Sequence, residues 1–324
     1  MVEPRFIVKA MPVGAKIVGL TPGDEQDPAV RAGLYRAWLD NGVLLFTEVN
    51  TVERHLALSE VFGELEEHPF PEVRSKVHPM LIDISGDRRS VAYVYDEADV
   101  LVNRIAWHRD TAYTRDICKG AMLRMIEVPA EDGETMIADT AKAYDDLPEE
   151  LKKRLGGLEY KATLRMGPRE QTRPGAFWST ARPATPQEDP QWGGKAIVDG
   201  DDPKIIANYP SVVLPAMLTH PESGRRCIFL SPTYVDFFIG MSKEESEDLL
   251  HKLAEHMLQP KYIYKHRWSP NEAIIWDNRR CMHAGFGNKI DQRRYGLRTT
   301  LAGAIRVGRF FEKGAKAQVR HFAD

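Results

Sequence analysis

Two residues able to bind a metal ion lie close together in the stretch "NRIAWHRDTAYTRD", residues 103–116. His108 and Asp110 are two positions apart, and alternate residues of an extended chain point to the same side. An imidazole and a carboxylate that face a common point supply two of the three ligands of a two-histidine, one-carboxylate iron site. The pair by itself is equally compatible with a surface turn in which Asp110 forms a salt bridge.

A candidate third ligand and two arginines occur near the end of the chain. His283 lies just past the apolar segment "AIIWD" (273–277), and Arg294 and Arg298 are four residues apart in "RRYGLRTTLAGAI". Their even spacing places both arginines on one face of a strand. If that face lines the inside of a barrel, the arginines require anionic partners. The other alternative turns both of them outward into solvent.

The composition excludes several classes of protein. The 324 residues are 43% apolar and 28% charged, which is typical of globular domains, and a net charge of −3 does not indicate a nucleic-acid surface. The three cysteines are far apart and include no Cys-x-x-Cys pair, which argues against a disulfide framework and fits a reducing compartment. The first 20 residues lack the apolar run of a signal peptide or membrane helix. We therefore expect a soluble cytoplasmic protein with no nucleic-acid or membrane partner.

Short segments rich in β-branched residues, separated by turn residues, predict many strands. The predicted strands are 15–20, 42–49, 78–85, 120–128, 134–140, 225–230, 273–277 and 297–305. Strands do not alternate regularly with helices, so a doubly wound parallel sheet is not expected. The pattern predicts a mainly β (α+β) fold, a sandwich or barrel core with helices outside it.

Helices are predicted by their end signals. Asp27-Pro28 begins a helix that ends at Gly42, and Ser242 with Glu245 forms a capping box. The other predicted helices are 51–65 and a pair within 139–158 that is interrupted at Pro148. The stretch from about 165 to 222 is rich in proline, glycine and polar residues, which predicts a lid or a disordered insert within a single domain, 1–324.

These motifs stand in the same order in a known family. The chain resembles the taurine dioxygenase and 2,4-dichlorophenoxyacetate dioxygenase family of iron(II)- and 2-oxoglutarate-dependent oxygenases over nearly its whole length. The resemblance rests on "PVGAKIVGL", "GVLLFTEV", "VFGELEEHP", "WHRDTAY", "DGETMIADT", "WDNRRCMHAGFG" and "QRRYGLRTTLAG". It implies a double-stranded β-helix, or jelly roll, flanked by helices. It also implies Fe(II) as cofactor, 2-oxoglutarate as cosubstrate and O2.

The resemblance assigns roles to individual residues. His108, Asp110 and His283 match the family's iron ligands. Thr135 and Arg294 match the residues that hold the distal carboxylate of 2-oxoglutarate, for which a guanidinium fork is well suited. Because the carboxylate ligand is present, where related halogenases have glycine or alanine, hydroxylation is favoured over halogenation.

The residues expected to meet the substrate are less well defined. Arg298 and His68 match residues that contact the sulfonate of taurine, and Arg104 stands where the taurine enzyme has asparagine. We expect a small anionic substrate, namely a sulfonate, sulfate ester, phenoxyalkanoate or other carboxylate. Arg104 could instead face solvent or pair with a nearby carboxylate. Family members are often dimers or tetramers, so a homo-oligomer is an expectation by resemblance alone.

The expected reaction converts 2-oxoglutarate and O2 into succinate and CO2 while the substrate is hydroxylated, and the product fragments if the hydroxylated carbon bears oxygen, nitrogen or sulfur. Two alternatives are a metal-dependent hydrolase that uses the same three ligands and a non-catalytic, metal-stabilised jelly-roll binding protein. Arg109, between two of the ligands, is expected to point away from the metal into a structural or rim position. Trp107, Trp276 and Phe286 are expected either to line the site or to belong to the core.

Overall fold

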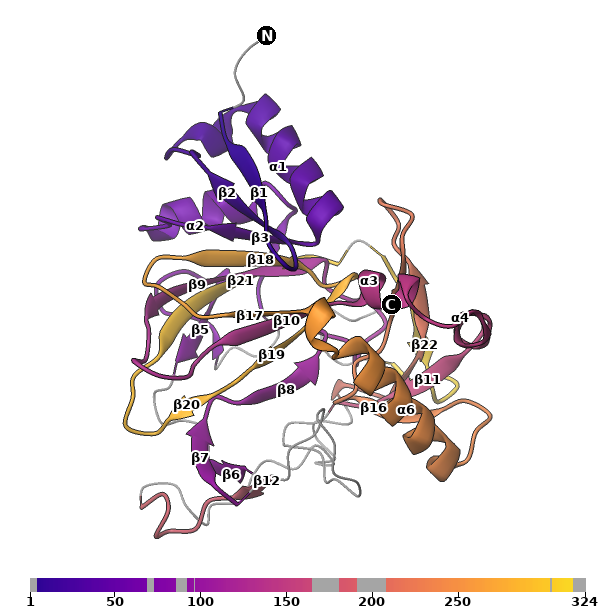
Figure 1. Cartoon of the computed structure of the whole chain (residues 1–324). Coiled ribbons are helices and arrows are strands. Elements are labelled where there is room, and N and C mark those ends of the chain that lie inside the picture. Colours follow the sequence, from indigo (N-terminus) through magenta and orange to yellow (C-terminus); the bar gives the residue numbers. More distant parts are fainter. Residues whose placement is uncertain are drawn as a thin grey trace.

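The structure is a computed structural model that describes residues 5–68, 73–85, 92–95, 97–164, 181–190, 208–303 and 305–316. Strands dominate it, and a few helices cover the outside of the sheets (Figure 1). This confirms the predicted mainly β fold with flanking helices. Within the described ranges, no helix combines the length and the apolar character needed to cross a bilayer.

Two sheets form the layers that matter for the site. The larger sheet has the strand order β1-β2-β3-β18-β9-β21-β4, with β5 beside β21, and the smaller has the order β17-β10-β19-β8. Figure 1 shows β18, β9 and β21 in one layer and β10, β19 and β8 in the layer next to it. Their strands are β1 (Ile7–Ala10), β2 (Ala15–Val18), β3 (Val43–Phe46), β4 (Leu65–Glu66), β5 (Leu81–Ser85), β8 (Ile105–His108), β9 (Gly120–Glu127), β10 (Thr135–Asp139), β17 (Ile263–His266), β18 (Ala273–Asp277), β19 (Cys281–Gly285) and β21 (Tyr295–Leu301).

Three smaller sheets lie beside these layers. They have the orders β16-β11-β13-β22, β12-β6-β7-β20 and β14-β15. Their strands are β6 (Tyr93–Tyr95), β7 (Asp99–Val102), β11 (Glu159–Ala162), β12 (Ala181–Pro183), β13 (Val212–Pro215), β14 (Met217–Thr219), β15 (Arg226–Ile228), β16 (Val235–Phe238), β20 (Asn288–Lys289) and β22 (Arg309–Phe310).

The helices with clear capping signals begin and end where predicted, but the helix predicted for 51–65 ends early, at Ser59. In α1, the Asp27 side chain accepts hydrogen bonds from two backbone N–H groups of the first turn, and Gly42 ends the helix in a left-handed conformation with φ of 75°. Pro148 separates α3 from α4, and Ser242 with Glu245 forms the predicted capping box of α6. Helix α2 ends four residues before Gly63. The helices are α1 (Pro28–Asn41), α2 (Val52–Ser59), α3 (Thr140–Asp145), α4 (Glu149–Leu155) and α6 (Lys243–Met257), with 3-10 turns η1 (Asp24–Gln26) and η3 (Pro260–Tyr262).

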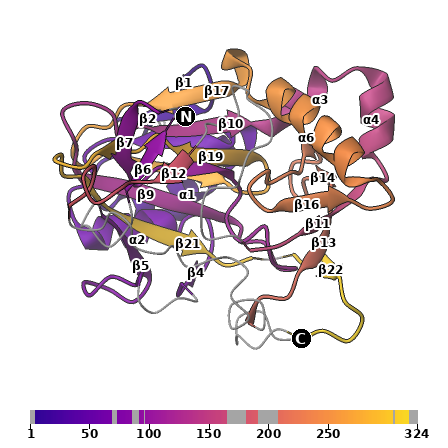
Figure 2. The same cartoon turned by 90° about the horizontal axis from the view of Figure 1, so that it is seen from below.

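The core explains why β18 is an uninterrupted apolar run. Ile274 and Trp276 point into a cluster shared with Ile137 of β10, whereas Ala273 and Ile275 pack beneath α1 and α2. A strand that is buried on both faces needs no alternation of apolar and polar residues. Figure 2 shows α3, α4 and α6 gathered at one end of the molecule.

The predicted lid is only partly within the described residues. Residues 165–180 and 191–207 lie outside the described residues. Within the described range 181–190, the chain forms β12, which pairs with β6. The prediction of a loop extending to residue 222 is wrong for 212–219, because β13 is buried and pairs with β11 and β22. The strand was not predicted because its apolar run, Val212 to Leu214, is only three residues long and is flanked by Pro210 and Pro215.

Candidate active site

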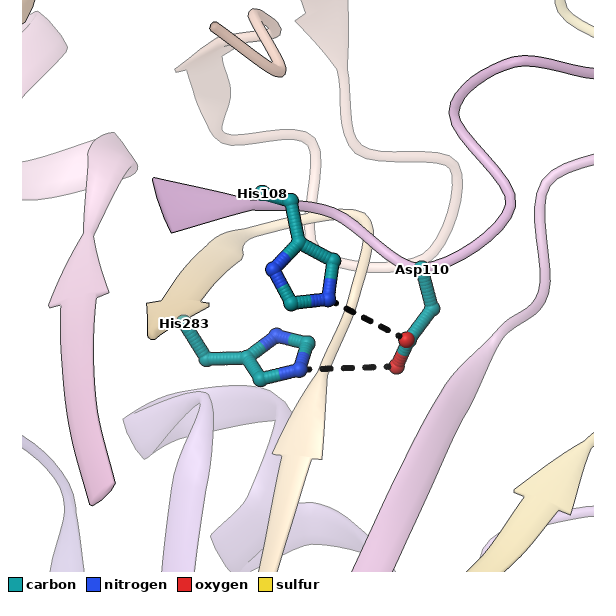
Figure 3. A group of neighbouring side chains, drawn as sticks. All are labelled: His108, Asp110 and His283. Carbon is teal, nitrogen blue, oxygen red and sulfur yellow. Dashed lines mark ion pairs between the residues drawn. The ribbon is translucent and has the colours of Figure 1, made fainter. Parts of the chain in front are cut away.

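Three candidate metal ligands converge from two neighbouring strands. His108 ends β8 and is paired in register with His283, which lies in the middle of β19. The His108 and His283 rings are 4.2 Å apart, and their Nε2 atoms lie 3.6 and 3.9 Å from the two oxygens of Asp110 (Figure 3). One donor atom from each residue lies within 4.8 Å of the other two. The three buried side chains therefore surround one point, as the sequence motif predicts.

The donor set fits a divalent metal ion. The Nδ1–H of His108 donates to the carbonyl oxygen of Ala106 at 2.8 Å, which leaves its Nε2 lone pair on the side of Asp110. Burial, together with the neighbouring His108, holds the pKa of His283 well below its usual value, so that this imidazole is neutral. Among the described residues, Asp110 Oδ2 has no hydrogen-bond partner. A buried carboxylate oxygen without a partner is unfavourable unless a cation satisfies it. Two neutral imidazoles and one carboxylate are the ligands that iron(II) oxygenases use.

The backbone of Asp110 is held by a side chain that the sequence analysis missed. Asn278 Oδ1 accepts from the Asp110 N–H, and Asn278 Nδ2 donates to the Asp110 carbonyl, both at 2.9 Å. Nδ2 also donates to the carbonyl of Cys118 at 3.1 Å. Asn278 follows β18 directly, so this strand end fixes the turn that carries the carboxylate ligand.

Arg109 is completely buried behind the two ligands that flank it. Its guanidinium donates to the carbonyls of Ile228, Leu230, Asn278 and Cys281 and to the hydroxyl of Thr140 at 2.6 to 3.2 Å. Of the two positions expected for Arg109, structural or at the rim of the site, the structure shows the structural one, because the side chain is fully buried. Cys281 is two residues before His283, so Arg109 links the turn of the first two ligands to the strand of the third.

The next residue, Thr111, has a left-handed backbone with φ of 56°. A β-branched residue rarely adopts this conformation, which typically costs about 1–3 kcal/mol. Its hydroxyl accepts from the Cys118 N–H at 2.8 Å, and its carbonyl accepts from the Thr114 hydroxyl, also at 2.8 Å. The chain is therefore held in a sharp turn immediately after Asp110.

The side of the site expected to bind 2-oxoglutarate is built on β10 and β21. Arg294 directly precedes β21, and its Nε donates to the carbonyl of Gly133 at 3.0 Å, two residues before Thr135. Burial lowers the pKa of Arg294 to about 10, and none of the ion pairs among the described residues involves it. Thr135 Oγ1 accepts from the indole N–H of Trp268 at 3.0 Å. The Thr135 hydroxyl proton therefore remains available to another acceptor.

Arg298 is in direct contact with the triad. Its Nη1 donates to Asp110 Oδ1 at 3.0 Å and its Nη2 to Thr300 Oγ1 at 3.3 Å. Burial alone would raise the pKa of Asp110, but the Arg298 guanidinium and the neighbouring His108 outweigh it and hold that pKa far below its usual value. Arg298 is therefore next to the metal position, and it joins β21 of the larger sheet to the turn after β8 of the smaller one.

Arg104 directly precedes β8, and His68 lies two residues beyond β4. A bulge in β8 pairs Ile105 with Gly285 while His108 pairs with His283, so position 105 rather than 104 is in phase with His108. The Arg104 guanidinium stacks on the ring of Tyr95 at 4.1 Å. His68 is half-buried, follows β4, and accepts from Arg74 through its carbonyl at 2.6 Å. Arg104 thus contacts an aromatic ring, an arrangement that the sequence analysis did not anticipate.

The three tryptophan and phenylalanine candidates have different roles. Trp276 packs its ring 4.5 Å from that of His283, so it lines the site. Trp107 belongs to the large core cluster beneath α6. Phe286 lies under the ammonium group of Lys265 at 4.1 Å. Trp268, which the sequence analysis missed, had no motif to distinguish it from a core tryptophan.

A groove of about 480 Å³ opens where β21 ends, beyond Thr300. Glu66, Met80, Asp116, Ala302 and Gly303 are among its lining residues. Glu66 is paired in register with Thr300, to which Arg298 donates. The groove therefore adjoins the end of β21, and none of the three candidate ligands is among its lining residues.

Comparison with known proteins agrees with this geometry. Residues 8–300 match the family model described as taurine catabolism dioxygenase TauD, TfdA family. The (S)-phenoxypropionate/alpha-ketoglutarate-dioxygenase of Sphingobium herbicidovorans is 30% identical over 90% of this chain and 92% of its own. The alkylsulfatase of Acinetobacter baylyi is 26% identical over 93% and 86%. The chain belongs to the TauD/TfdA family, and it is a 2-oxoglutarate-dependent dioxygenase that requires Fe(II) and O2.

A solved structure shows that the fold is shared as well. The structure of a taurine dioxygenase from Burkholderia xenovorans superposes with a TM-score of 0.71, covering 96% of each chain at 24% identity. Family membership decides for the oxygenase and against the two alternatives, a hydrolase and a non-catalytic binding protein.

Proposed function

We propose that this enzyme hydroxylates a small organic anion at a site formed by His108, Asp110 and His283. Iron(II) bound by these residues would supply the coupled oxidation, in which O2 converts 2-oxoglutarate into succinate and CO2 and the substrate gains a hydroxyl group. The observation that carries the proposal is the buried Arg294 guanidinium, which donates to Gly133 at the start of the β10 segment and has no carboxylate among its described partners. A buried cation of this kind requires an anionic ligand.

The proposed cosubstrate site combines Arg294 with Thr135. The guanidinium can hold a carboxylate through two parallel hydrogen bonds. The hydroxyl of Thr135 accepts a hydrogen bond from the Trp268 N–H, so its own proton is free to be donated to a further partner. Gly133 has φ of +75°, and a Cβ there would approach Pro129 to 2.5 Å and Arg294 Cδ to 3.3 Å. Glycine at 133 thus lets the loop close against the arginine.

The proposed substrate anion binds on the side of Arg298. This side chain is within hydrogen-bonding distance of a metal ligand and remains partly exposed, at 14%. His68 and Arg104 are proposed to complete the cationic environment, because His68 follows β4, which pairs with β21, and Arg104 directly precedes β8, which ends at His108. The two relatives named above act, by their names, on a phenoxypropionate and on an alkyl sulfate, and both substrates are anions. If the hydroxylated carbon bears oxygen or sulfur, the product would fragment.

We further propose that the two main sheets form a jelly roll within one domain, 1–324. The support is that the Arg298–Asp110 pair bridges the two sheets across the site. The three cysteines are free and buried, which supports the cytoplasmic expectation. A dimer or tetramer remains a prediction from the family.

The test is a succinate-release screen with sulfonates, sulfate esters, phenoxyalkanoates and other small carboxylates. Before substrate is added, anaerobic Fe(II) with 2-oxoglutarate should give a weak visible absorption band. Substrate-dependent succinate release from at least one of these classes is the expected result. The absence of the band, or turnover of neutral compounds alone, would contradict the proposal.

A further inference from the structure

The edge strand of the smaller sheet places a histidine beside Thr135. His266 ends β17 and is paired in register with Thr135 of β10, so both side chains lie on the same face of the sheet (Figure 1). The pair before it on β17, Tyr264 with Ile137, continues across the sheet to the metal ligand His283. Because alternate residues of a strand share a face, His266 lies on the face that carries the site, two strands away from the ligand.

Both nitrogens of the His266 imidazole are held. Nδ1 shares a hydrogen bond of 2.7 Å with the Tyr264 hydroxyl, and Nε2 lies 3.1 Å from Oε2 of Glu272. Burial would raise the pKa of Glu272, but His266 and the backbone N–H of Ser269 outweigh it and lower that pKa. The carboxylate is therefore ionised although its side chain is only 14% exposed. The imidazole cannot turn without losing both contacts.

The held imidazole packs against Trp268. The two ring centroids are 4.5 Å apart and the rings are perpendicular. The indole N–H donates to Thr135 Oγ1 at 3.0 Å, and the rest of the indole is enclosed in the apolar cluster that contains Ile137. Edge-to-face contacts of this kind fix the orientation of a ring as well as its depth. The direction of the indole N–H therefore depends on the imidazole beside it.

Stability alone does not account for a charged pair at this place. Replacing a buried ion pair by apolar residues of similar size is often neutral or stabilising. The neighbouring position on the same face of β10 is filled by an apolar residue, Ile137, which is completely buried. What the pair of His266 and Glu272 adds is a single orientation for a ring, and that ring positions the donor to Thr135.

We propose, on the basis of the function proposed above, that His266 and Glu272 are positioning residues of the cosubstrate site. Glu272 holds the imidazole, the imidazole holds the indole of Trp268, and the indole N–H occupies one lone pair of the Thr135 hydroxyl. The hydroxyl proton is thereby directed to the distal carboxylate of 2-oxoglutarate. His266 and Glu272 do not touch the cosubstrate, and both act through Thr135.

The experiment is a double-mutant cycle on the apparent Kd for 2-oxoglutarate. Anaerobic Fe(II) enzyme is titrated with 2-oxoglutarate, and the visible absorption band is followed. His266→Leu should raise the Kd by about twofold to fivefold, and no more than Thr135→Val does, because one neutral hydrogen bond is at stake. Fe(II) affinity should stay as in wild type. In the Thr135→Val background, His266→Leu should leave the Kd unchanged, because the hydroxyl through which it acts is gone.

Two further sets of variants separate positioning from packing. Glu272→Leu should raise the Kd as His266→Leu does, and Glu272→Gln, which keeps an oxygen beside the imidazole, should restore most of the loss. His256→Leu is the matched control. His256 is also hydrogen-bonded, to the carbonyl of Ala143 at 2.7 Å, and its ring lies 5.6 Å from that of Tyr262. This variant can lose stability but should keep the wild-type Kd.

The possible failures are distinguishable. If the wild type shows no band, the proposed function fails and this inference fails with it. If the wild type shows the band but His266→Leu keeps the wild-type Kd, or its effect adds to that of Thr135→Val, the positioning role is overturned while the proposed function stands. An equal rise in His256→Leu overturns it as well. Thermal unfolding identifies the folded variants, and if His266→Leu does not fold, Tyr264→Phe takes its place in the cycle with the same expected pattern.

Discussion

Arg294, just before β21, and Arg298, within β21, are four residues apart but occupy opposite kinds of environment. Arg294 is buried, with one hydrogen bond to a backbone carbonyl and with no carboxylate among its described partners. Arg298 already has a carboxylate partner, because it donates to the metal ligand Asp110 at 3.0 Å. The first side of the site is therefore prepared for an external anion, whereas the charge on the second side is balanced from within the protein.

The difference follows from what each side must bind. The cosubstrate is the same in every turnover, so a rigid pocket built from paired strands and a single unsatisfied cation suits it. The substrate side carries the strained turn at Thr111 and a guanidinium whose partner would also bind the metal. A metal ion at Asp110 would compete with Arg298 for the carboxylate, which frees the guanidinium for a substrate anion.

The largest expected effect comes from removing the centre that both sides share. Asp110→Ala and His283→Ala should each abolish substrate-dependent succinate formation, because neither two-ligand remnant retains the donor set. Succinate release and Fe(II) binding are the measurements. His251→Ala, on the outer helix α6, should leave both unchanged. Full activity in Asp110→Ala would show that the triad is misassigned.

Arg294→Ala should affect the cosubstrate side alone. A lost charge-assisted pair typically costs about 2–5 kcal/mol when its partner stays buried, so the apparent 2-oxoglutarate requirement should rise by well over tenfold. Fe(II) affinity without 2-oxoglutarate should remain as in wild type. If the 2-oxoglutarate requirement is unchanged and the substrate KM rises instead, the roles of the two arginines are reversed.

The contrast between the two sides also explains what the sequence could predict. The candidate metal ligands, which the structure brings together, are recognisable because His108 and Asp110 are two residues apart and His283 adjoins a strongly apolar strand. The caps of α1 and α6 are local signals, and the structure confirms them. Such features depend on neighbours in the chain, and they were predicted well.

Other features depend on contacts between distant segments. Asn278 and Arg109 are polar residues whose role is defined by partners more than 100 positions away. The bulge in β8 changes which residues share a face with His108, and nothing in its local composition marks it. Substrate-side residues were therefore the least predictable part of the site.

Arg298→Ala should sharpen the comparison from the other side. The KM for an anionic substrate should rise by about tenfold or more, while the 2-oxoglutarate requirement stays the same, because a charged hydrogen bond contributes about 1.5–3 kcal/mol. The Arg298 guanidinium beside Asp110 repels the positive charge of Fe(II), so the affinity for Fe(II) should increase when the guanidinium is removed. Turnover of an anionic substrate and its neutral amide is compared in both enzymes. A wild-type enzyme that uses both equally well would exclude the anion-binding role.

The smallest expected effect concerns the hydroxyl of Thr135. Thr135→Val keeps the shape of the side chain but removes a neutral hydrogen bond, which typically contributes about 0.5–1.5 kcal/mol. The 2-oxoglutarate requirement should therefore rise by about twofold to tenfold, well below the effect of Arg294→Ala. The variant also leaves the buried Trp268 N–H without its acceptor. Urea unfolding should show a loss of about 1–3 kcal/mol in stability, the usual cost of an unsatisfied buried donor. Thr219→Val, at an exposed position of β14, is the control and should change neither quantity. A stability loss without a change in the 2-oxoglutarate requirement would show that Thr135 supports Trp268 and does not bind the cosubstrate, and that Arg294 holds the distal carboxylate without it.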